Sequence, residues 1–217
     1  MNTFGIIVVC ILILIFLNYL VSSHFNNKSV KLCDAKNNCD NYNVHAGHDD
    51  YNDAAFLMKE IQNRIDKLMH HLKNKYNINS KKTNEYINNR IKQLFSNYSN
   101  NNVFEISPRN TTGVTSYSDN KTKLILCMRK KEGKNNLHDI NTMMFVVVHE
   151  LAHIMNNRWG HTKSSNFWEL FKFMLVNSIE IGIYQPVNYA IHPIIYCGLE
   201  ITYSPIYDNS ITTDSLY

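Results

Sequence analysis

The chain of 217 residues lacks several features that indicate particular classes of protein. Its formal net charge is only +4, and no run of Lys and Arg forms a basic stripe. The composition therefore does not predict binding to nucleic acid. None of the five cysteines belongs to a CxxC pair, so no pattern typical of a structural zinc site is present. The length allows one domain with a hydrophobic core and additional segments.

The four cysteines that follow the N-terminal region have no diagnostic spacing. Cys33 and Cys39 are close enough in sequence to close a small loop in an oxidising compartment. Free buried thiols are the alternative for these two residues and for Cys127 and Cys197. Both readings stay open at the level of the sequence.

The N-terminal residues 4–21 are apolar almost without interruption, and no Lys or Arg precedes them. As a helix they would extend about 27 Å, which is enough to cross a thin bilayer core. A cleaved signal peptide normally has a positive n-region and a shorter apolar stretch. We therefore predict an uncleaved transmembrane anchor in a lipid bilayer, with a secreted protein released by signal cleavage as the alternative. Lys28, Lys31 and Lys36 follow this segment, so the positive-inside rule predicts that the domain lies on the cytoplasmic side.

The rest of the chain is predicted to comprise a polar tether over 22–52, a domain over 53–207 and a C-terminal tail over 208–217. The tether is rich in Asn, Asp and His and shows no periodicity. Apolar residues at helical spacing predict two helices at the start of the domain, over 53–76 and 83–98.

The second half of the domain combines strands with helices, which predicts an α+β fold. Short apolar runs predict strands over 103–106 and 122–129. A helix capped by Asp139 or Asn141 is predicted to end near residue 157, and another is predicted over 164–181. The aromatic segment that follows, through Pro205, is predicted to pack on the domain.

His149, Glu150 and His153 form an HExxH motif, in which two histidines four residues apart lie on one face of a helix. Such a pair can bind one zinc ion, and the glutamate beside them can accept a proton from a water molecule. The apolar residues on both sides predict that the helix is buried. A buried helix whose histidines bond to backbone carbonyls is the alternative interpretation.

A catalytic zinc ion needs a third protein ligand and one open position. His161 follows Gly160, at which the chain can reverse and return the imidazole to the metal. Glu169 in the next helix is the second candidate, although its spacing from Asn166 also fits a helix cap. We predict His161 as the third ligand. Asp139 is a candidate for orienting a ligand histidine or for capping the helix.

The motif with Gly160-His161 and the pair Phe167-Trp168 resembles the WLM-type metallopeptidases, relatives of the SprT/Spartan group. The chain is more similar still to the membrane-anchored WLM-like proteins of large nucleocytoplasmic DNA viruses. This similarity covers about residues 103–207 and includes the segments 124–129, 139–145, 167–173 and 196–198.

The resemblance implies that His149, His153 and His161 bind Zn²⁺ and that Glu150 is the catalytic base. It also implies a minimal zincin: a small antiparallel or mixed sheet, an active-site helix and flanking helices. In cellular WLM proteins the third histidine usually follows the second by six residues, whereas the interval here is eight. The additional residues fall in the turn over 156–159.

The sequence therefore predicts a membrane-anchored, zinc-dependent endopeptidase that acts on a protein or peptide substrate. A non-catalytic protein of a virion or host membrane, with zinc as a structural element closed by Cys127 or Cys197, is the alternative. The strand over 124–128 is predicted to be an edge strand that pairs with an extended substrate. Tyr184, Tyr196 and Tyr203 are equal candidates for stabilising an oxyanion.

Overall fold

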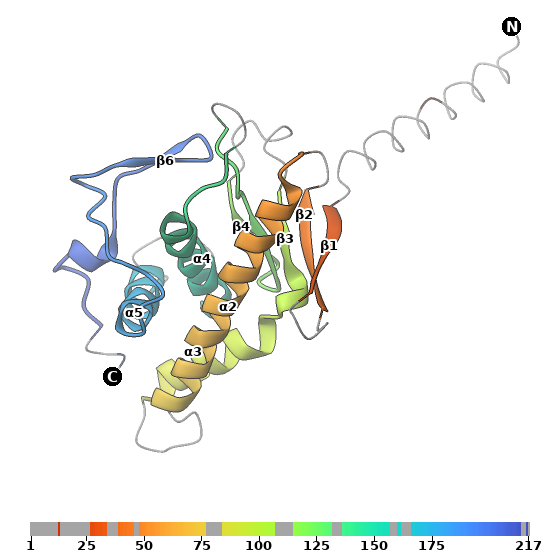
Figure 1. Ribbon diagram of the computed structural model, residues 1–217. Helices are drawn as coiled ribbons and strands as arrows, with labels where there is room; N and C mark the ends of the chain where they lie inside the picture. The colour runs from red at the N-terminus through yellow and green to blue at the C-terminus, as the bar shows by residue number, and fades with distance from the viewer. Residues whose placement is uncertain are drawn as a thin grey trace, which may run out of the picture.

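The computed structural model describes residues 13, 27–33, 39–45, 48–76, 84–106, 115–131, 136–156, 160–161, 166–213 and 216. Within these ranges the protein has a mixed α/β fold with four named helices, a five-stranded mixed sheet and a separate two-stranded sheet (Figure 1). The predicted combination of helices with a mixed sheet is confirmed.

The five-stranded sheet has the order β1-β2-β3-β5-β4. Its strands are β1 (Asn27–Cys33), β2 (Cys39–His45), β3 (Val103–Glu105), β4 (Tyr117–Asp119) and β5 (Lys123–Leu126). The outer pairs β1–β2 and β4–β5 are antiparallel, whereas β2–β3 and β3–β5 are parallel. The strands predicted over 103–106 and 122–129 are confirmed as β3 and β5 with shorter bounds.

β1 and β4 are the edge strands of this sheet, so the predicted edge over 124–128 is wrong. β5 lies between β3 and β4 and buries Leu124 and Leu126, which explains its apolar sequence. β4 has the polar sequence Tyr-Ser-Asp, with Tyr117 exposed. A solvated edge strand does not need an apolar run, and this strand was therefore not predicted.

The predicted tether over 22–52 is also wrong for its described residues, because β1 and β2 form a hairpin within the sheet. Each strand buries alternate side chains, with Val30 on β1 and Tyr42 and Val44 on β2. Two or three apolar residues separated by polar ones are too few to stand out as a strand pattern. The hairpin shows that the folded domain begins well before residue 53.

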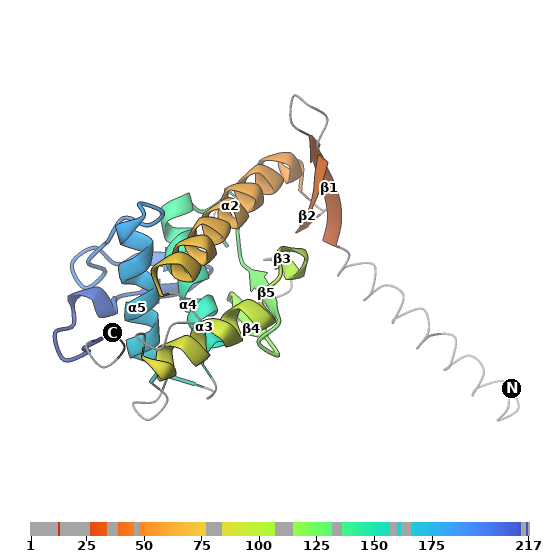
Figure 2. The same cartoon turned by 90° about the horizontal axis from the view of Figure 1, so that it is seen from below.

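The helices match the predicted periodicity closely. Their bounds are α2 (Tyr51–Lys75), α3 (Glu85–Asn97), α4 (Ile140–Met155) and α5 (Phe167–Glu180). Short 3-10 turns, η1 (Asn100–Asn102) and η4 (Pro205–Tyr207), and the hairpin β6 (Ile194–Tyr196) with β7 (Leu199–Ile201) complete the described elements. α2 lies beside β1 and β2, α4 lies beside β4, and α5 lies on the side of α4 away from the large sheet (Figures 1 and 2).

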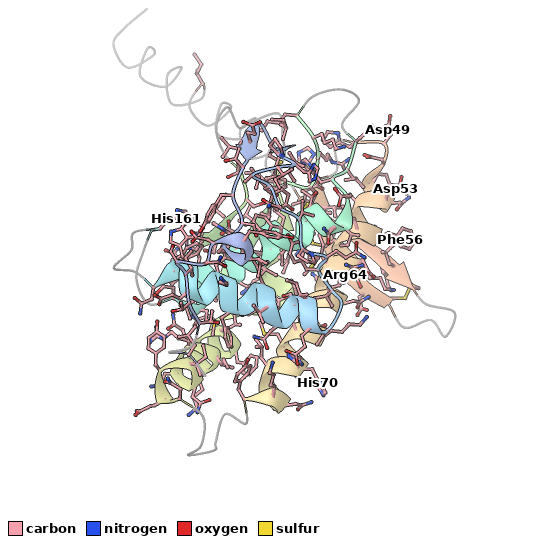
Figure 3. The ribbon with its side chains drawn as sticks, turned by 90° about the vertical axis from the view of Figure 1, so that its left-hand side faces the viewer. Asp49, Asp53, Phe56, Arg64, His70 and His161 are labelled. Carbon is pink, nitrogen blue, oxygen red and sulfur yellow. A yellow bond between two sulfur atoms is a disulfide. The ribbon has the colours of Figure 1, made fainter. Side chains whose placement is uncertain are left out.

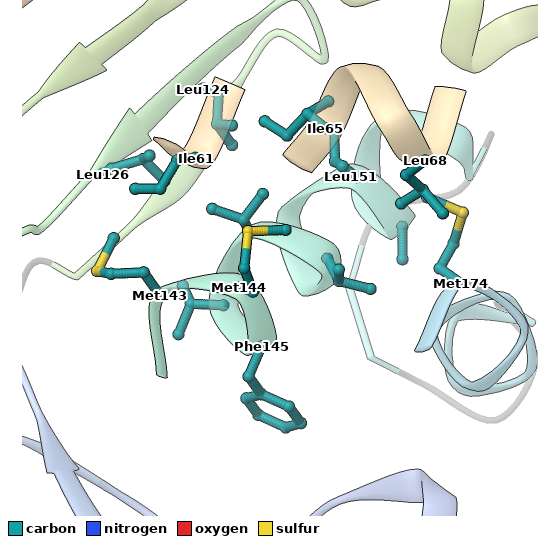
Figure 4. Packing of buried hydrophobic residues seen from close by; sticks show 14 of the residues in the cluster. Ile61, Ile65, Leu68, Leu124, Leu126, Met143, Met144, Phe145, Leu151 and Met174 are labelled. Carbon is teal, nitrogen blue, oxygen red and sulfur yellow. The ribbon is translucent and has the colours of Figure 1, made fainter. Parts of the chain in front are cut away.

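The hydrophobic core surrounds α4. Figure 4 shows Leu151 of this helix close to Ile65 and Leu68 of α2, while Met143 lies toward Leu126 of β5. Twelve of its sixteen residues are buried, so α4 is covered on nearly every face. The aromatic segment after α5 also packs on the domain as predicted, with Tyr184 and Tyr189 almost fully buried.

All four cysteines outside the N-terminal segment are paired. Cys33–Cys39 closes the β1–β2 hairpin, and Cys127–Cys197 joins residues that directly follow β5 and β6. Disulfides persist mainly in oxidising compartments. Both pairs form disulfides in this structure, where the sequence left free buried thiols as the alternative.

Among the described residues, no helix has both the length and the apolar character needed to cross a bilayer. The predicted anchor over 4–21 lies outside the described residues except for Ile13.

A buried ion pair joins the strands of the large sheet to the start of α2. Arg129 is fully buried; its Nε donates to Glu105 at 2.7 Å and its guanidinium also contacts Asp50. The second carboxylate oxygen of Glu105 accepts a hydrogen bond from the backbone N–H of His45 at 2.6 Å. Removal of one partner from such a pair is costly because the other charge stays buried.

We expect Glu105→Ala to lower the free energy of unfolding by about 3–5 kcal/mol, because Arg129 loses its fully buried partner. Glu60, which pairs with Arg64 on the exposed side of α2, provides the control, and Glu60→Ala should cost no more than about 1 kcal/mol. Urea denaturation followed by circular dichroism measures both. Equal losses for the two variants would contradict the structural role of the pair.

Candidate metal centre

Helix α4 positions the first three candidate residues. Its N-cap is Asp139, whose Oδ1 accepts from the Thr142 backbone N–H at 2.9 Å and whose Oδ2 accepts from the Thr142 hydroxyl at 2.6 Å. Asp139 therefore caps α4, which is one of the two roles predicted for it. One helical turn separates His149 from His153, so both imidazoles lie on the same face of α4.

The chain after α4 returns His161 to this face. The side-chain amide of Gln93 on α3 donates to the carbonyl oxygens of Ile154 and Asn156, which secures the C-terminal end of α4. Gly160 then has φ +83°, a left-handed conformation that glycine adopts without steric cost. The Trp168 indole N–H donates to the carbonyl oxygen of His161 at 2.9 Å, which fixes this residue from the side of α5.

The three imidazoles converge through their Nε2 atoms. The His153–His149 and His161–His149 separations are 3.2 Å, and the His153–His161 separation is 2.9 Å. Tetrahedral zinc with Zn–N bonds of about 2.0–2.1 Å requires nitrogens about 3.3 Å apart. Within the described residues, this is the group of His, Cys, Asp or Glu able to hold a metal ion. The predicted ligands are thus brought together.

The protonation state of the three imidazoles favours the binding of a cation. Burial, followed by the proximity of His153 and His161, lowers the pKa of His149 well below its ordinary value. Burial likewise lowers the pKa of His153 to about 4 and also lowers that of His161. All three rings are therefore neutral at pH 7, which is the form that binds metal.

Phe167, the first residue of α5, packs against all three imidazole rings. It stacks on His153 with ring centroids 4.3 Å apart and meets His149 and His161 edge-on at 4.9 and 4.6 Å. Phe171, one turn later, meets His149 edge-on at 5.0 Å. These contacts restrict ring rotation and exclude water from one side of the cluster.

Glu150 faces the edge strand β4. It is 5% exposed, and burial raises the pKa of its carboxyl group to about 8. The Ser118 backbone N–H and hydroxyl both donate to the carboxyl group, and these bonds favour its ionised form. The sequence did not indicate Ser118, because nothing in a polar three-residue strand marks it as a neighbour of residue 150.

The other candidates from the sequence lie outside the cluster. Glu169 lines a separate cavity with Asp208 and is not a member of the histidine cluster. Cys127 and Cys197 are bonded to each other. Another histidine, His70 near the C-terminal end of α2, is well separated from His161 (Figure 3).

A cavity of about 290 Å³ opens beside His149 and Glu150. The three tyrosines predicted as candidates for the oxyanion differ in their positions relative to it. Tyr184 lies outside it and packs on Phe145. Tyr203 lines the cavity, but its hydroxyl donates to Asp208 at 2.8 Å. Tyr196 lines the cavity with its hydroxyl 2.5 Å from the Ser116 hydroxyl.

Known proteins similar to this chain come from large DNA viruses. The uncharacterized protein R325 of Acanthamoeba polyphaga mimivirus is 36% identical over 154 residues, which cover 69% of this chain and 71% of that protein. The chain belongs to the family of this mimivirus protein. The name of this relative states no activity.

Two proteins of invertebrate iridescent viruses match a shorter part of the chain. The uncharacterized protein 136R of invertebrate iridescent virus 6 is 36% identical over 74 residues, or 34% of this chain and 40% of that protein. The uncharacterized protein 042R of invertebrate iridescent virus 3 is 42% identical over 71 residues, or 33% and 43%. No protein-family model and no solved structure matches the chain.

Proposed function

We propose that this protein is a zinc-dependent endopeptidase of the WLM-like zincin type, anchored to a membrane by residues 4–21. The convergence of three neutral imidazoles to within 3.2 Å, with Glu150 next to His149 on the same helix, carries this proposal. The mixed sheet beside α4 and the open cavity next to the cluster are consistent with it.

The residues of the cluster divide the chemistry between them. Zinc held by the three histidines would polarise the scissile carbonyl group and lower the pKa of a water molecule. Glu150, whose ionised form would be favoured by the charge of the ion and by the Ser118 hydrogen bonds, would accept a proton from that water and later transfer it to the leaving amine. Ser118 would orient the carboxylate through its two hydrogen bonds. β4, an edge strand of the large sheet beside α4, would thus contribute to the orientation of the base.

Tyr196 is the residue that we assign to stabilisation of the oxyanion. The Ser116 hydroxyl oxygen accepts from the Cys127 backbone N–H at 2.8 Å, so the Ser116 proton can be donated to Tyr196. Burial raises the pKa of the Tyr196 hydroxyl. The nearby Cys127 backbone N–H lowers this pKa, but by less. With its oxygen already accepting, the Tyr196 proton is available to a substrate in the cavity.

The alternative, a protein in which zinc has only a structural role, has less support. A structural site normally fills its fourth position with Cys or His. In the described residues the cluster contains three ligands, and Cys127 and Cys197 are joined in a disulfide. A fourth position left to water would match a catalytic site.

We expect Glu150→Gln to retain about one zinc ion per chain and to lower kcat on an unfolded protein such as casein by about 10²–10⁴-fold, because the amide cannot accept a proton. Glu169→Gln is the matched control, since that carboxylate lies outside the cluster. Metal analysis and peptide release measure the two properties. Undiminished hydrolysis by Glu150→Gln would contradict the mechanism.

Removal of the third imidazole tests the metal site itself. We expect His161→Ala to weaken zinc binding by more than about 100-fold, which exceeds the usual cost of losing an outer hydrogen bond to a ligand. His192→Ala removes an exposed histidine from a turn outside the cluster and should leave the zinc affinity unchanged. Competition with a chelating dye measures both affinities. Equal affinities would assign the third position to another residue.

Loss of the Tyr196 hydroxyl should weaken stabilisation of the transition state more than it weakens binding of the substrate. We expect Tyr196→Phe to lower kcat by about 10²–10³-fold with little change in KM or zinc content. Tyr184→Phe, outside the cavity, should retain full activity. A rise in KM alone, or loss of zinc, would show that Tyr196 acts in substrate binding or in folding.

A further inference from the structure

The cavity beside the histidine cluster has an apolar interior that the catalytic chemistry does not require. Its walls come from α4, α5 and the β6–β7 hairpin, and its aromatic side is formed by Phe145, Trp168 and Phe171. Phe145 and Phe171 meet edge-on with centroids 5.2 Å apart. These rings are packed in the core and present a fixed apolar surface.

The opposite wall is the hairpin, which contributes Leu199 and Ile201. Leu199 is 53% exposed although it borders the cavity. A ligand in the cavity would remove this side chain from water, which favours an apolar ligand. Tyr196 holds this wall against Ser116, which precedes β4, and the Cys127–Cys197 disulfide holds it against the residue that follows β5.

The volume and charge of the cavity restrict what it accepts. At about 290 Å³ it is at the lower limit of ligand pockets and suits one large side chain with its backbone. Glu200 on its lining disfavours an acidic side chain through repulsion between like charges.

We infer that this cavity binds a large apolar side chain, aromatic or long aliphatic, from the substrate residue next to the bond that is cleaved. This inference rests on the proposed peptidase function, because a peptide substrate would reach the cavity that His149 and Glu150 line. The protein would therefore prefer peptides with residues such as Phe, Leu or Met at this position and would discriminate against Asp and Glu.

Binding can be measured without catalysis. We expect full-length Glu150→Gln protein, in detergent and with zinc, to bind the blocked peptide Ala-Ala-Phe-Ala-Ala at least about tenfold more tightly than its all-Ala counterpart in calorimetry. The corresponding Glu peptide should bind most weakly. Leu199→Asp should abolish the preference for Phe. Ile195→Asp, a change of the same kind on β6 at a residue that is 52% exposed and outside the cavity, should preserve it.

The same peptides, tested for cleavage by the wild-type protein, separate the two proposals. Equal binding of the Phe, Ala and Glu peptides, or equal effects of Leu199→Asp and Ile195→Asp, would overturn the inference about the cavity. Cleavage of all three at similar rates would overturn it too, while supporting the peptidase function. Preferential binding of the Phe peptide without any cleavage would support the cavity and contradict the proposed function.

Discussion

Burial of α4 is the constraint on which the rest of the structure depends. A helix with apolar residues on nearly all sides must be covered on nearly all sides, and the large sheet, α2, α3 and α5 provide that cover. The polar groups of α4 lie on the part of the helix that remains. There His149, Glu150 and His153 have little access to water, so the imidazoles are neutral and the Glu150 pKa is raised. The same burial that stabilises the fold thus prepares the two candidate nitrogen ligands on α4 for a cation.

The position of His161 depends on more than the chain between α4 and α5. Gln93 holds the carbonyl groups at the end of α4, and Trp168 holds the carbonyl group of His161. Phe167 packs against all three imidazoles. Because residues from two other helices fix the position of His161, an interval of eight residues after His153 still places its Nε2 within 3.2 Å of both other ligands. A longer turn is tolerated when its end is held independently.

Local patterns in the sequence were sufficient for the helices and for the HExxH residues. Helical periodicity and the Asp139 cap depend on residues a few positions apart, and the bounds of α2 through α5 follow them closely. His161 could be predicted because a glycine before it allows the chain to reverse. The strands β1, β2 and β4 were missed, since each is short and buries few apolar residues. Ser118 and Tyr196 could not be assigned, because their positions result from contacts across 32 and 80 residues. No local pattern records such pairings.

The two sheets approach α4 from different directions, and a disulfide joins them. β4 of the large sheet supplies Ser118 to Glu150, whereas the β6–β7 hairpin supplies Tyr196 to the cavity. The Cys127–Cys197 disulfide links the residue after β5, the partner of β4, to the residue after Tyr196. A two-stranded hairpin is marginally stable on its own, so its position needs such an attachment. The separation between the hairpin and the large sheet is therefore set in part by this bond.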